Sequence, residues 1–256
     1  MKFNLKKSVM ALTMIATGLS SQFAQADEPG TANGEWHHYT GDIKGSRYSP
    51  LDQINADNFE DLELAWSFST KNLGTRSEYK LEVTPIMIDG MLYATAGTRR
   101  AAISLDGSTG ELKWIHSMEE GLRGGMAPRQ LSGRGLSYWT DGNGDDRIYY
   151  VTTGYRLIAL NAHTGVPINS FGTDGNGILD LKIGAVQGNE VQIDLVTGEI
   201  GLHATPTVVG DMIIVGSAMK EGMTIDNYNN TKGLVRAYDV RSGELVWQFD
   251  PIPRPG

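Results

Sequence analysis

Apolar and polar residues alternate with a period of two along much of the chain, which is the pattern of half-buried β-strands. Residues 84–94 show it on both sides of Asp89-Gly90, a dipeptide that favours a tight hairpin turn, and therefore predict two strands. Nearly the same phrase returns at residues 205–216. No helical pattern separates these strands from the following ones, so the alternation predicts an all-β fold.

A second phrase occurs three times. A strand ends in an apolar residue followed by Asp or Asn, a tight turn with Thr-Gly or Ser-Gly follows, and the next strand closes on an aromatic residue. The three copies span residues 105–114, 160–171 and 238–247, and they close on Trp114, Phe171 and Trp247. Units of three or four short antiparallel strands without helices between them are typical of the blades of a β-propeller. Such units bury their apolar faces by stacking on one another.

The first 26 residues differ from the rest. Lys2, Lys6 and Lys7 precede an apolar stretch, and Ala24-Gln25-Ala26 precedes Asp27. This is the layout of a secretory signal peptide, and it predicts a periplasmic protein with no integral membrane segment once residues 1–26 are removed. The apolar stretch is far shorter than the roughly 20 residues of a membrane-spanning helix, which disfavours the alternative of an anchor.

Residues 27–256 form the expected mature chain. Residues 27–33 are small and polar and predict a flexible lead. Residues 36–64 predict a wrapping segment with one short helix near residues 56–62, and residues 64–68 predict the first strand.

Charge and composition exclude several kinds of function. Loss of the three leading lysines changes Lys+Arg from 22 to 19 against 30 Asp+Glu, so the net charge moves from −8 to −11. An acidic chain without a basic cluster is not expected to bind nucleic acid. The chain has no cysteine, which excludes disulfides, thiolate sites, a haem attached through Cys-x-x-Cys-His and a lipid-bearing cysteine.

Two other features show no functional pattern. The acidic segment 141–146 departs from an EF-hand loop, because Asp146 occupies the position of the glycine and Thr152 that of the glutamate, so a solvent turn is expected. The five histidines have no ligand spacing and are expected on the surface or in strands.

Further residues match a known family pattern. The aromatic-closing turns are similar to a tryptophan docking motif, and a run before the first strand follows the family's spacing: Tyr48-Ser49, Ile54-Asn55, Asn58-Phe59 and Leu62-Glu63. On these residues the chain resembles the quinoprotein dehydrogenases. The resemblance implies an eight-bladed propeller that binds pyrroloquinoline quinone (PQQ) and calcium on its axis. Arg134-Gly135 lacks the vicinal cysteine pair of methanol-type members, which favours the glucose dehydrogenase-like ones.

The resemblance assigns roles to particular residues. Glu82 would contact the quinone or orient an arginine, and Arg134 would pair with a carboxylate of the cofactor. Thr153, or alternatively Thr152, would donate a hydroxyl to another carboxyl group. The quinone would also lie against the loop residues Ser217, Ala218 and Met219, and Glu221 would ligate calcium. For Glu82 and Arg134 the alternatives are a solvent-facing strand edge and an exposed turn.

The implied reaction is oxidation of an alcohol or an aldose sugar by hydride transfer to the quinone, with electrons passed on to a quinone or a cytochrome. No catalytic residue is assigned, because the family's aspartate base is expected beyond Gly256. The chain is therefore expected to hold the amino-terminal blades, about half of the ring, of a longer enzyme. The alternative is a non-catalytic periplasmic propeller that serves as a scaffold in outer-membrane protein assembly. Such scaffolds usually begin with a lipid-bearing cysteine, which this chain lacks.

Overall fold

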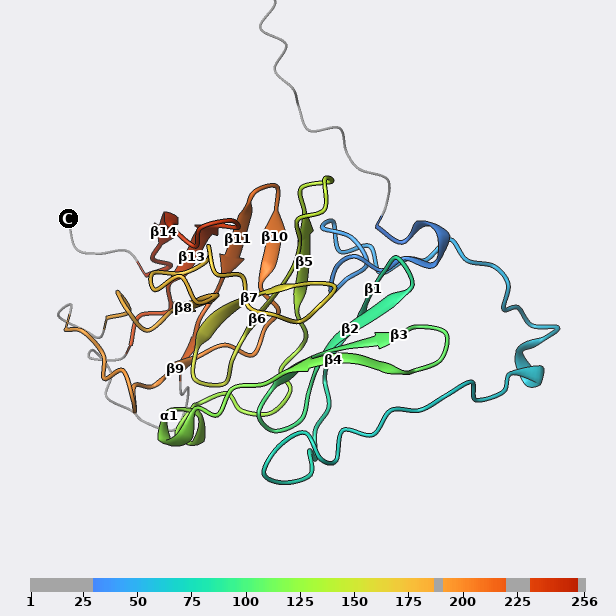
Figure 1. Ribbon diagram of the computed structural model, residues 1–256, viewed down its shortest axis with the longest axis horizontal. Coiled ribbons are helices and arrows are strands. Elements are labelled where there is room, and N and C mark those ends of the chain that lie inside the picture. Colours follow the sequence, from blue (N-terminus) through green and yellow to red (C-terminus); the bar gives the residue numbers. More distant parts are fainter. Residues whose placement is uncertain (1–29, 187–190, 220–230, 253–256) are drawn as a thin grey trace, which may run out of the picture.

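The computed structural model describes residues 30–186, 191–219 and 231–252. Within this part of the chain, three four-stranded antiparallel sheets lie side by side (Figure 1). Sheet 1 comprises β1 (Ile86–Ile88), β2 (Met91–Ala96), β3 (Ala101–Asp106) and β4 (Leu112–His116); sheet 2 comprises β5 (Ser137–Thr140), β6 (Asp146–Val151), β7 (Arg156–Asn161) and β8 (Ile178–Asp180); sheet 3 comprises β10 (Thr207–Val209), β11 (Met212–Val215), β13 (Val235–Asp239) and β14 (Leu245–Phe249). The predicted all-β fold of four-stranded blades is confirmed.

The remaining described elements are small. A two-stranded ribbon pairs β9 (Ile200–Gly201) with β12 (Ala218–Met219). The helices are η1 (Ala32–Gly34), η2 (Phe59–Asp61) and α1 (Gly121–Gly125). In the described residues, no helix has the length and apolar character that crossing a membrane requires.

Both predicted hairpins form. Strand β1 pairs with β2 and β10 pairs with β11, each in antiparallel register. At the first hairpin Asp89 has φ 49° and Gly90 has φ 76°. Positive φ at both central residues is the geometry of a type I′ turn, whose twist matches that of the flanking strands.

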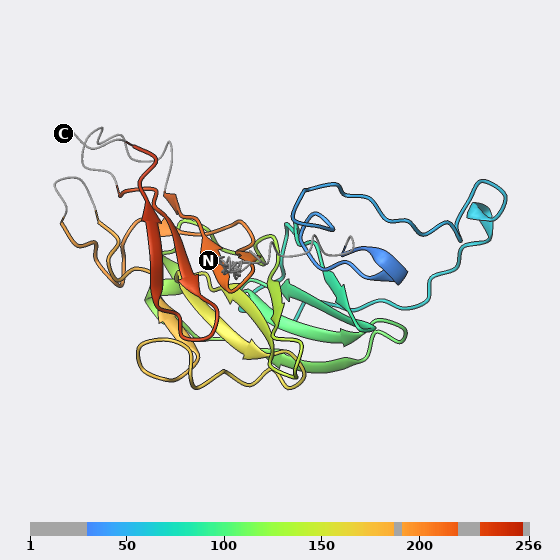
Figure 2. The same cartoon turned by 90° about the horizontal axis from the view of Figure 1, so that it is seen from above.

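The sheets stack like the blades of a propeller, with sheet 2 between the other two (Figure 2). Both faces of sheet 2 are buried. Strand β6 shows this most clearly. Ile148 and Tyr150 belong to the apolar cluster shared with sheet 1, whereas Tyr149 and Val151 belong to the cluster shared with sheet 3. Because successive side chains of a strand point to opposite faces, a strand packed between two neighbours is apolar at every position.

Aromatic side chains pack against the turn glycines of the sheets, and Trp114 of β4 in this way joins sheet 1 to sheet 2. The indole ring of Trp66 packs against Gly110 in the turn of sheet 1, and the ring of Trp114 packs against Gly165 in the turn of sheet 2. Each indole N–H also donates to a carbonyl three residues before that glycine: Trp66 Nε1 to Gly107 O at 3.1 Å and Trp114 Nε1 to Ala162 O at 2.8 Å.

The joint between sheets 2 and 3 uses different chemistry. Phe171 packs against Gly243, the equivalent turn glycine, but a phenyl ring has no N–H to donate. The equivalent carbonyl, that of Val240, instead accepts from the Tyr149 hydroxyl at 2.5 Å and from Arg147 Nη1 at 3.1 Å. Two residues of β6 thus replace the missing indole donor.

Three details of the sequence prediction were wrong. Residues 64–68 do not form a strand; Leu64 is 83% exposed and no described strand pairs with this segment. The predicted helix near residues 56–62 is only the single turn η2. The strand expected to close on Phe171 is broken, since Pro167 makes an isolated bridge and β8 begins only at Ile178.

Pro167 lacks the N–H that a ladder of strand hydrogen bonds needs, which explains the interruption.

The last strand of the stack, β14, is uncovered. Every side chain of β14 is exposed, and Trp247 is 37% exposed. No described sheet covers this strand.

Candidate functional site

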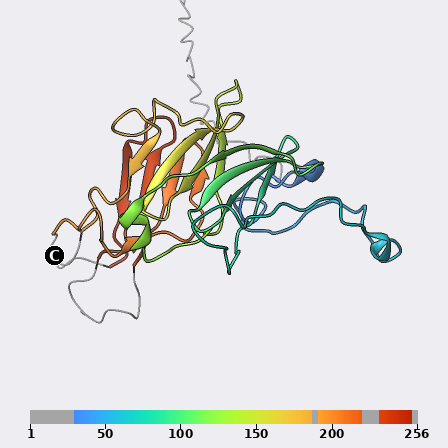
Figure 3. The same ribbon diagram turned by 60° about the horizontal axis from the view of Figure 1, so that its bottom comes forward.

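A cavity of about 510 Å³ lies where the three sheets converge. Its lining comes mainly from segments that precede the first strand of each sheet. These residues are Lys80 and Glu82 before β1, Arg129 and Arg134 before β5, Leu202, His203 and Ala204 before β10, and Gly216, Ser217 and Ala218 after β11. Figure 3 shows the sheets side by side, and the segments that enter their first strands are hydrogen-bonded to one another.

Backbone hydrogen bonds tie these segments to one another. The Thr84 N–H donates to Arg134 O at 3.1 Å, and the Arg134 N–H donates to His203 O at 3.0 Å. Gly135, with φ +134°, lets the chain pass close to Thr84, because a Cβ there would lie 3.0 Å from Thr84 O. One continuous set of bonds therefore connects the cavity walls of all three sheets.

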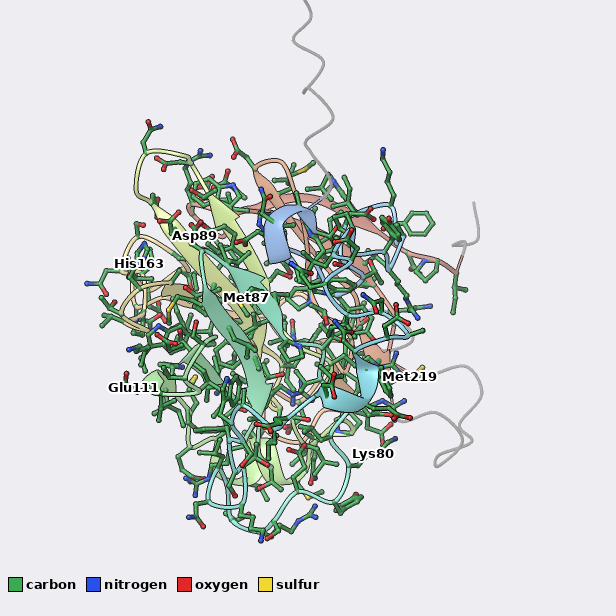
Figure 4. All side chains as sticks on the ribbon, turned by 90° about the vertical axis from the view of Figure 1, so that its right-hand side faces the viewer. Lys80, Met87, Asp89, Glu111, His163 and Met219 are labelled. Atoms are coloured by element: carbon green, nitrogen blue, oxygen red, sulfur yellow. The ribbon has the colours of Figure 1, made fainter. Side chains whose placement is uncertain are left out.

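Four of the residues predicted from the sequence line this cavity: Glu82, Arg134, Ser217 and Ala218. Met219 is outside the lining, but its carbonyl accepts a hydrogen bond from Arg129 Nη2 at 3.3 Å. Pairing of β12 with β9 holds this loop beside the segment that carries Leu202. In Figure 4, Met219 and Lys80 lie on the same side of the molecule.

Thr153 is not among the lining residues. Its hydroxyl donates to Glu120 Oε2 at 3.0 Å, and the alternative, Thr152, donates to Glu120 Oε1 at 2.9 Å. The buried Glu120 carboxylate also accepts from the Gly154 N–H at 2.6 Å and pairs with Arg156. Both threonine hydroxyls are thus held by a carboxylate of the same chain. Glu221, the predicted calcium ligand, lies outside the described residues.

The cavity is predominantly cationic. Among the described residues, Lys80, Arg129 and Arg134 line it together with one carboxylate, that of Glu82. No described residue pairs with the exposed Arg134 guanidinium, which leaves its donors available to a ligand. Arginine presents a planar fork of N–H donors that suits a carboxylate.

Glu82 is held by two of the other lining residues. His203 Nε2 lies 2.7 Å from Glu82 Oε2, and Lys80 Nζ lies 3.2 Å from Glu82 Oε1. The hydrogen bond with His203, followed by that with Lys80, lowers the pKa of the Glu82 carboxyl below its usual value. Glu82 is therefore ionised at neutral pH. In the structure its partners are His203 and Lys80, whereas the sequence led us to expect contact with the quinone or with an arginine.

Six of the described lining residues were not predicted from the sequence: the charged or titratable Lys80, Arg129 and His203, and also Leu202, Ala204 and Gly216. His203 was expected on the surface or in a strand, yet it occupies the repeat position of Glu82, two residues before a Thr-Pro pair in each hairpin. Aligning the two hairpins on that pair would have placed His203 in the cavity. Lys80 and Arg129 occupy no such repeated position, so the sequence alone does not mark them as cavity residues.

The donor set fits a polyanionic ligand such as PQQ. Among the described lining residues the cations outnumber the carboxylate of Glu82, and the Arg134 guanidinium suits one of the three carboxyl groups of such a molecule. A metal site is a separate matter, since the described part of the chain contains no group of three or more His, Asp or Glu that could hold an ion. The acidic turn at residues 141–146 is folded on itself, with Asp141 Oδ1 accepting the N–H groups of Asn143 and Asp145.

Comparison with known proteins agrees with this geometry. The chain is 32% identical over 245 residues to the quinoprotein glucose dehydrogenase of Escherichia coli, covering 89% of this chain and 28% of the relative. It is 30% identical over 255 residues to the enzyme of the same name from Gluconobacter oxydans, covering 92% of this chain and 30% of that protein. The chain thus spans less than a third of the length of these relatives.

A solved structure is similar as well. The quinohemoprotein alcohol dehydrogenase of Comamonas testosteroni matches with a TM-score of 0.66 and 26% identity, over 88% of this chain and 28% of that one. Residues 36–256 match the family described as "Glucose/ethanol/alcohol dehydrogenase, beta-propeller domain", labelled PQQ. The chain belongs to this family of PQQ-dependent dehydrogenase propellers.

Proposed function

We propose that the protein carrying this chain is a PQQ-dependent dehydrogenase that oxidises the CH–OH group of an alcohol or an aldose sugar. The observation that carries the proposal is the cationic cavity at the convergence of three sheets in a chain of this family. PQQ would supply the two-electron acceptor that protein side chains lack. A quinone or a cytochrome would take the electrons onward.

The residues of this chain would bind and orient the cofactor. Arg134, Arg129 and Lys80 would neutralise its carboxylates, and the backbone of Ser217 and Ala218 would line its other side. Glu82, ionised and fixed by His203, would accept a hydrogen bond from a ring N–H. Calcium, with Glu221 among its ligands, belongs to the same proposal and would polarise the quinone oxygens.

Titration with PQQ tests this function. The full-length protein is titrated with PQQ, with and without calcium, and binding is followed by cofactor absorbance. Arg134→Gln should weaken binding about tenfold, the equivalent of one charge-assisted hydrogen bond. Arg241→Gln is the matched control, because this exposed arginine pairs with Asp211 and is not a lining residue of the cavity.

Failure of the wild-type protein to bind PQQ would reject the enzyme proposal and favour the scaffold alternative. If the wild-type protein does bind PQQ, its turnover of a panel of alcohols and aldoses with an artificial dye acceptor identifies the substrate class.

The location of the protein is a further part of the proposal. We infer that residues 1–26 direct it to the periplasm and are removed. Cell fractionation and amino-terminal sequencing test this inference: the mature protein should begin at Asp27, and retention of the lysine-rich start would contradict cleavage.

A further inference from the structure

Arg100 lies at the end of the turn between β2 and β3 and is 3% exposed. Its backbone φ is +52°, a left-handed conformation that is uncommon outside glycine. Such conformations persist where the surrounding contacts hold them, and they are frequent at functional sites. The contacts of this arginine are therefore informative.

The guanidinium group joins three segments of chain through backbone carbonyls. Nε donates to Leu131 O at 3.0 Å, Nη2 donates to Arg129 O at 3.1 Å, and Nη1 donates to Leu202 O at 2.6 Å. Nη1 also donates to Val151 O at 3.1 Å. Weaker bonds reach the carbonyls of Gln130 and Thr152, each at 3.5 Å.

Two of these acceptors belong to residues that line the cavity, Arg129 and Leu202. Leu202 also precedes His203, whose side chain holds Glu82. A single side chain of sheet 1 thus fixes the backbone from which the cavity residues of sheets 2 and 3 project.

The loop before β5 is shaped around this guanidinium. Leu131 adopts φ +69° and Gly133 adopts φ +69°. A Cβ at Gly133 would lie only 2.9 Å from Arg100 Nε, so the loop requires a glycine there. Arg134, the next residue, emerges directly from this turn into the cavity.

Arg100 forms no ion pair with any described residue. Its described hydrogen-bond partners are all carbonyl oxygens. Burial lowers the pKa of Arg100 to about 10, so it remains protonated at neutral pH. A structural arginine on the far side of the same sheet stack behaves differently: Arg147 bonds to two carbonyls but also pairs with Asp145 at 2.6 Å.

We propose that Arg100 is a positioning residue of the cofactor cavity, which orients Arg129, Arg134 and His203 by fixing the backbone segments that carry them. The inference rests on the proposed function, because it concerns the affinity of the same cavity for PQQ. It goes beyond it in assigning this role to a buried side chain that is not a lining residue.

The test compares two Arg→Lys substitutions in the full-length protein. Arg100→Lys keeps a cation but removes the fork that reaches three segments, whereas Arg147→Lys makes the same change at the joint between sheets 2 and 3. Thermal unfolding of the cofactor-free proteins is measured first, and PQQ affinity is then measured by absorbance titration well below both Tm values. Both variants should have a lower Tm than the wild-type protein, but only Arg100→Lys should bind PQQ about tenfold more weakly.

A second variant, Arg100→Gln, removes the charge as well and should weaken PQQ binding further if it folds; if it does not fold, the Arg100→Lys comparison alone decides. Wild-type PQQ affinity in Arg100→Lys, or an equal loss of affinity in Arg147→Lys, would overturn the inference while leaving the proposed function intact. A wild-type protein that binds no PQQ would instead reject both.

Discussion

The indole ring of Trp114 occupies the space into which a side chain at Gly165 would project. A Cβ built on Gly165 would lie 2.6 Å from Trp114 Cδ2, far inside van der Waals contact. Gly165 also has φ +69°, which disfavours any L-residue. One glycine in the turn of sheet 2 is therefore required both by its own backbone and by the ring from sheet 1.

Gly165→Ala is expected to lower the free energy of unfolding by about 2 to 5 kcal/mol, because the strain of a positive φ adds to the clash with the ring. Gly142→Ala is the matched control: Gly142 has φ +72°, but nothing lies within 4 Å of its Cβ position. That variant should lose only about 1 kcal/mol. Urea denaturation measures both, and equal losses would contradict the close contact.

Tyr149→Phe tests the joint between sheets 2 and 3. The Tyr149 hydroxyl is the donor that stands in for an indole N–H at Val240 O, and Arg147 supplies the second donor. Because the carbonyl keeps one partner, the expected loss is about 1 kcal/mol of unfolding free energy.

Tyr238→Phe is the control for that loss, since Tyr238 is buried in the same apolar cluster and its hydroxyl has no described hydrogen-bond partner. Chemical denaturation of both variants gives the comparison. A loss at Tyr238 as large as that at Tyr149 would show that the hydroxyl bond does not stabilise the joint.

The repeated turn phrase was sufficient to locate the joints between sheets, because the turn glycine and the carbonyl three residues before it recur at fixed offsets. The closing aromatic residue follows four residues after the glycine at Trp114 and Trp247 and six residues after it at Phe171. The phrase could not show how Phe171 is compensated. Tyr149 appears in the sequence only as one of several consecutive apolar residues of a strand, and the direction of its hydroxyl depends on a sheet that lies 91 residues further along.

Only part of the site could be predicted, because its other residues are brought together by contacts between distant segments. Glu82 and Arg134 stand in recognisable phrases, and the structure brings them to one cavity. Arg100, next to Arg99 in a turn, has the sequence pattern of an exposed basic pair. Only the folded arrangement, which brings the carbonyl of Leu202 to its guanidinium, distinguishes it.

The buried Lys182 is expected to make the free energy of unfolding depend on pH in the alkaline range. It is 1% exposed, its Nζ donates to Gly198 O at 3.3 Å, and burial lowers its pKa to about 8 from a usual 10.5. Between these values the unfolded chain binds a proton that the folded chain does not, so the unfolding free energy should rise with pH across this window.

Lys182→Met should remove that rise, which amounts to about 3 kcal/mol at most. Urea denaturation at several pH values between 7 and 10 follows it, with Lys113→Met as control, because Lys113 is solvent-exposed and its pKa is raised by Glu111. If the unfolding free energies of the wild-type protein and of Lys182→Met changed equally with pH, Lys182 would not be the cause of the rise.

His203→Ala is expected to raise the pKa of the Glu82 carboxyl towards its usual value, because the hydrogen bond with His203 is the largest cause of the lowering. Lys80→Met removes the second cause and should raise it less. Carbon-13 NMR titration of the carboxyl groups, with Glu82→Gln to assign the signal, measures both shifts.

The sign of the accompanying stability effect follows from the same bond. A lowered folded-state pKa means that the contribution of Glu82 to stability is present above its unfolded value and is lost as pH falls through the folded value. His203→Ala should therefore flatten the acid side of the stability profile more than Lys80→Met does. If the lysine variant produced the larger pKa rise, the pairing with His203 would not be the main cause of the lowered pKa of the Glu82 carboxyl.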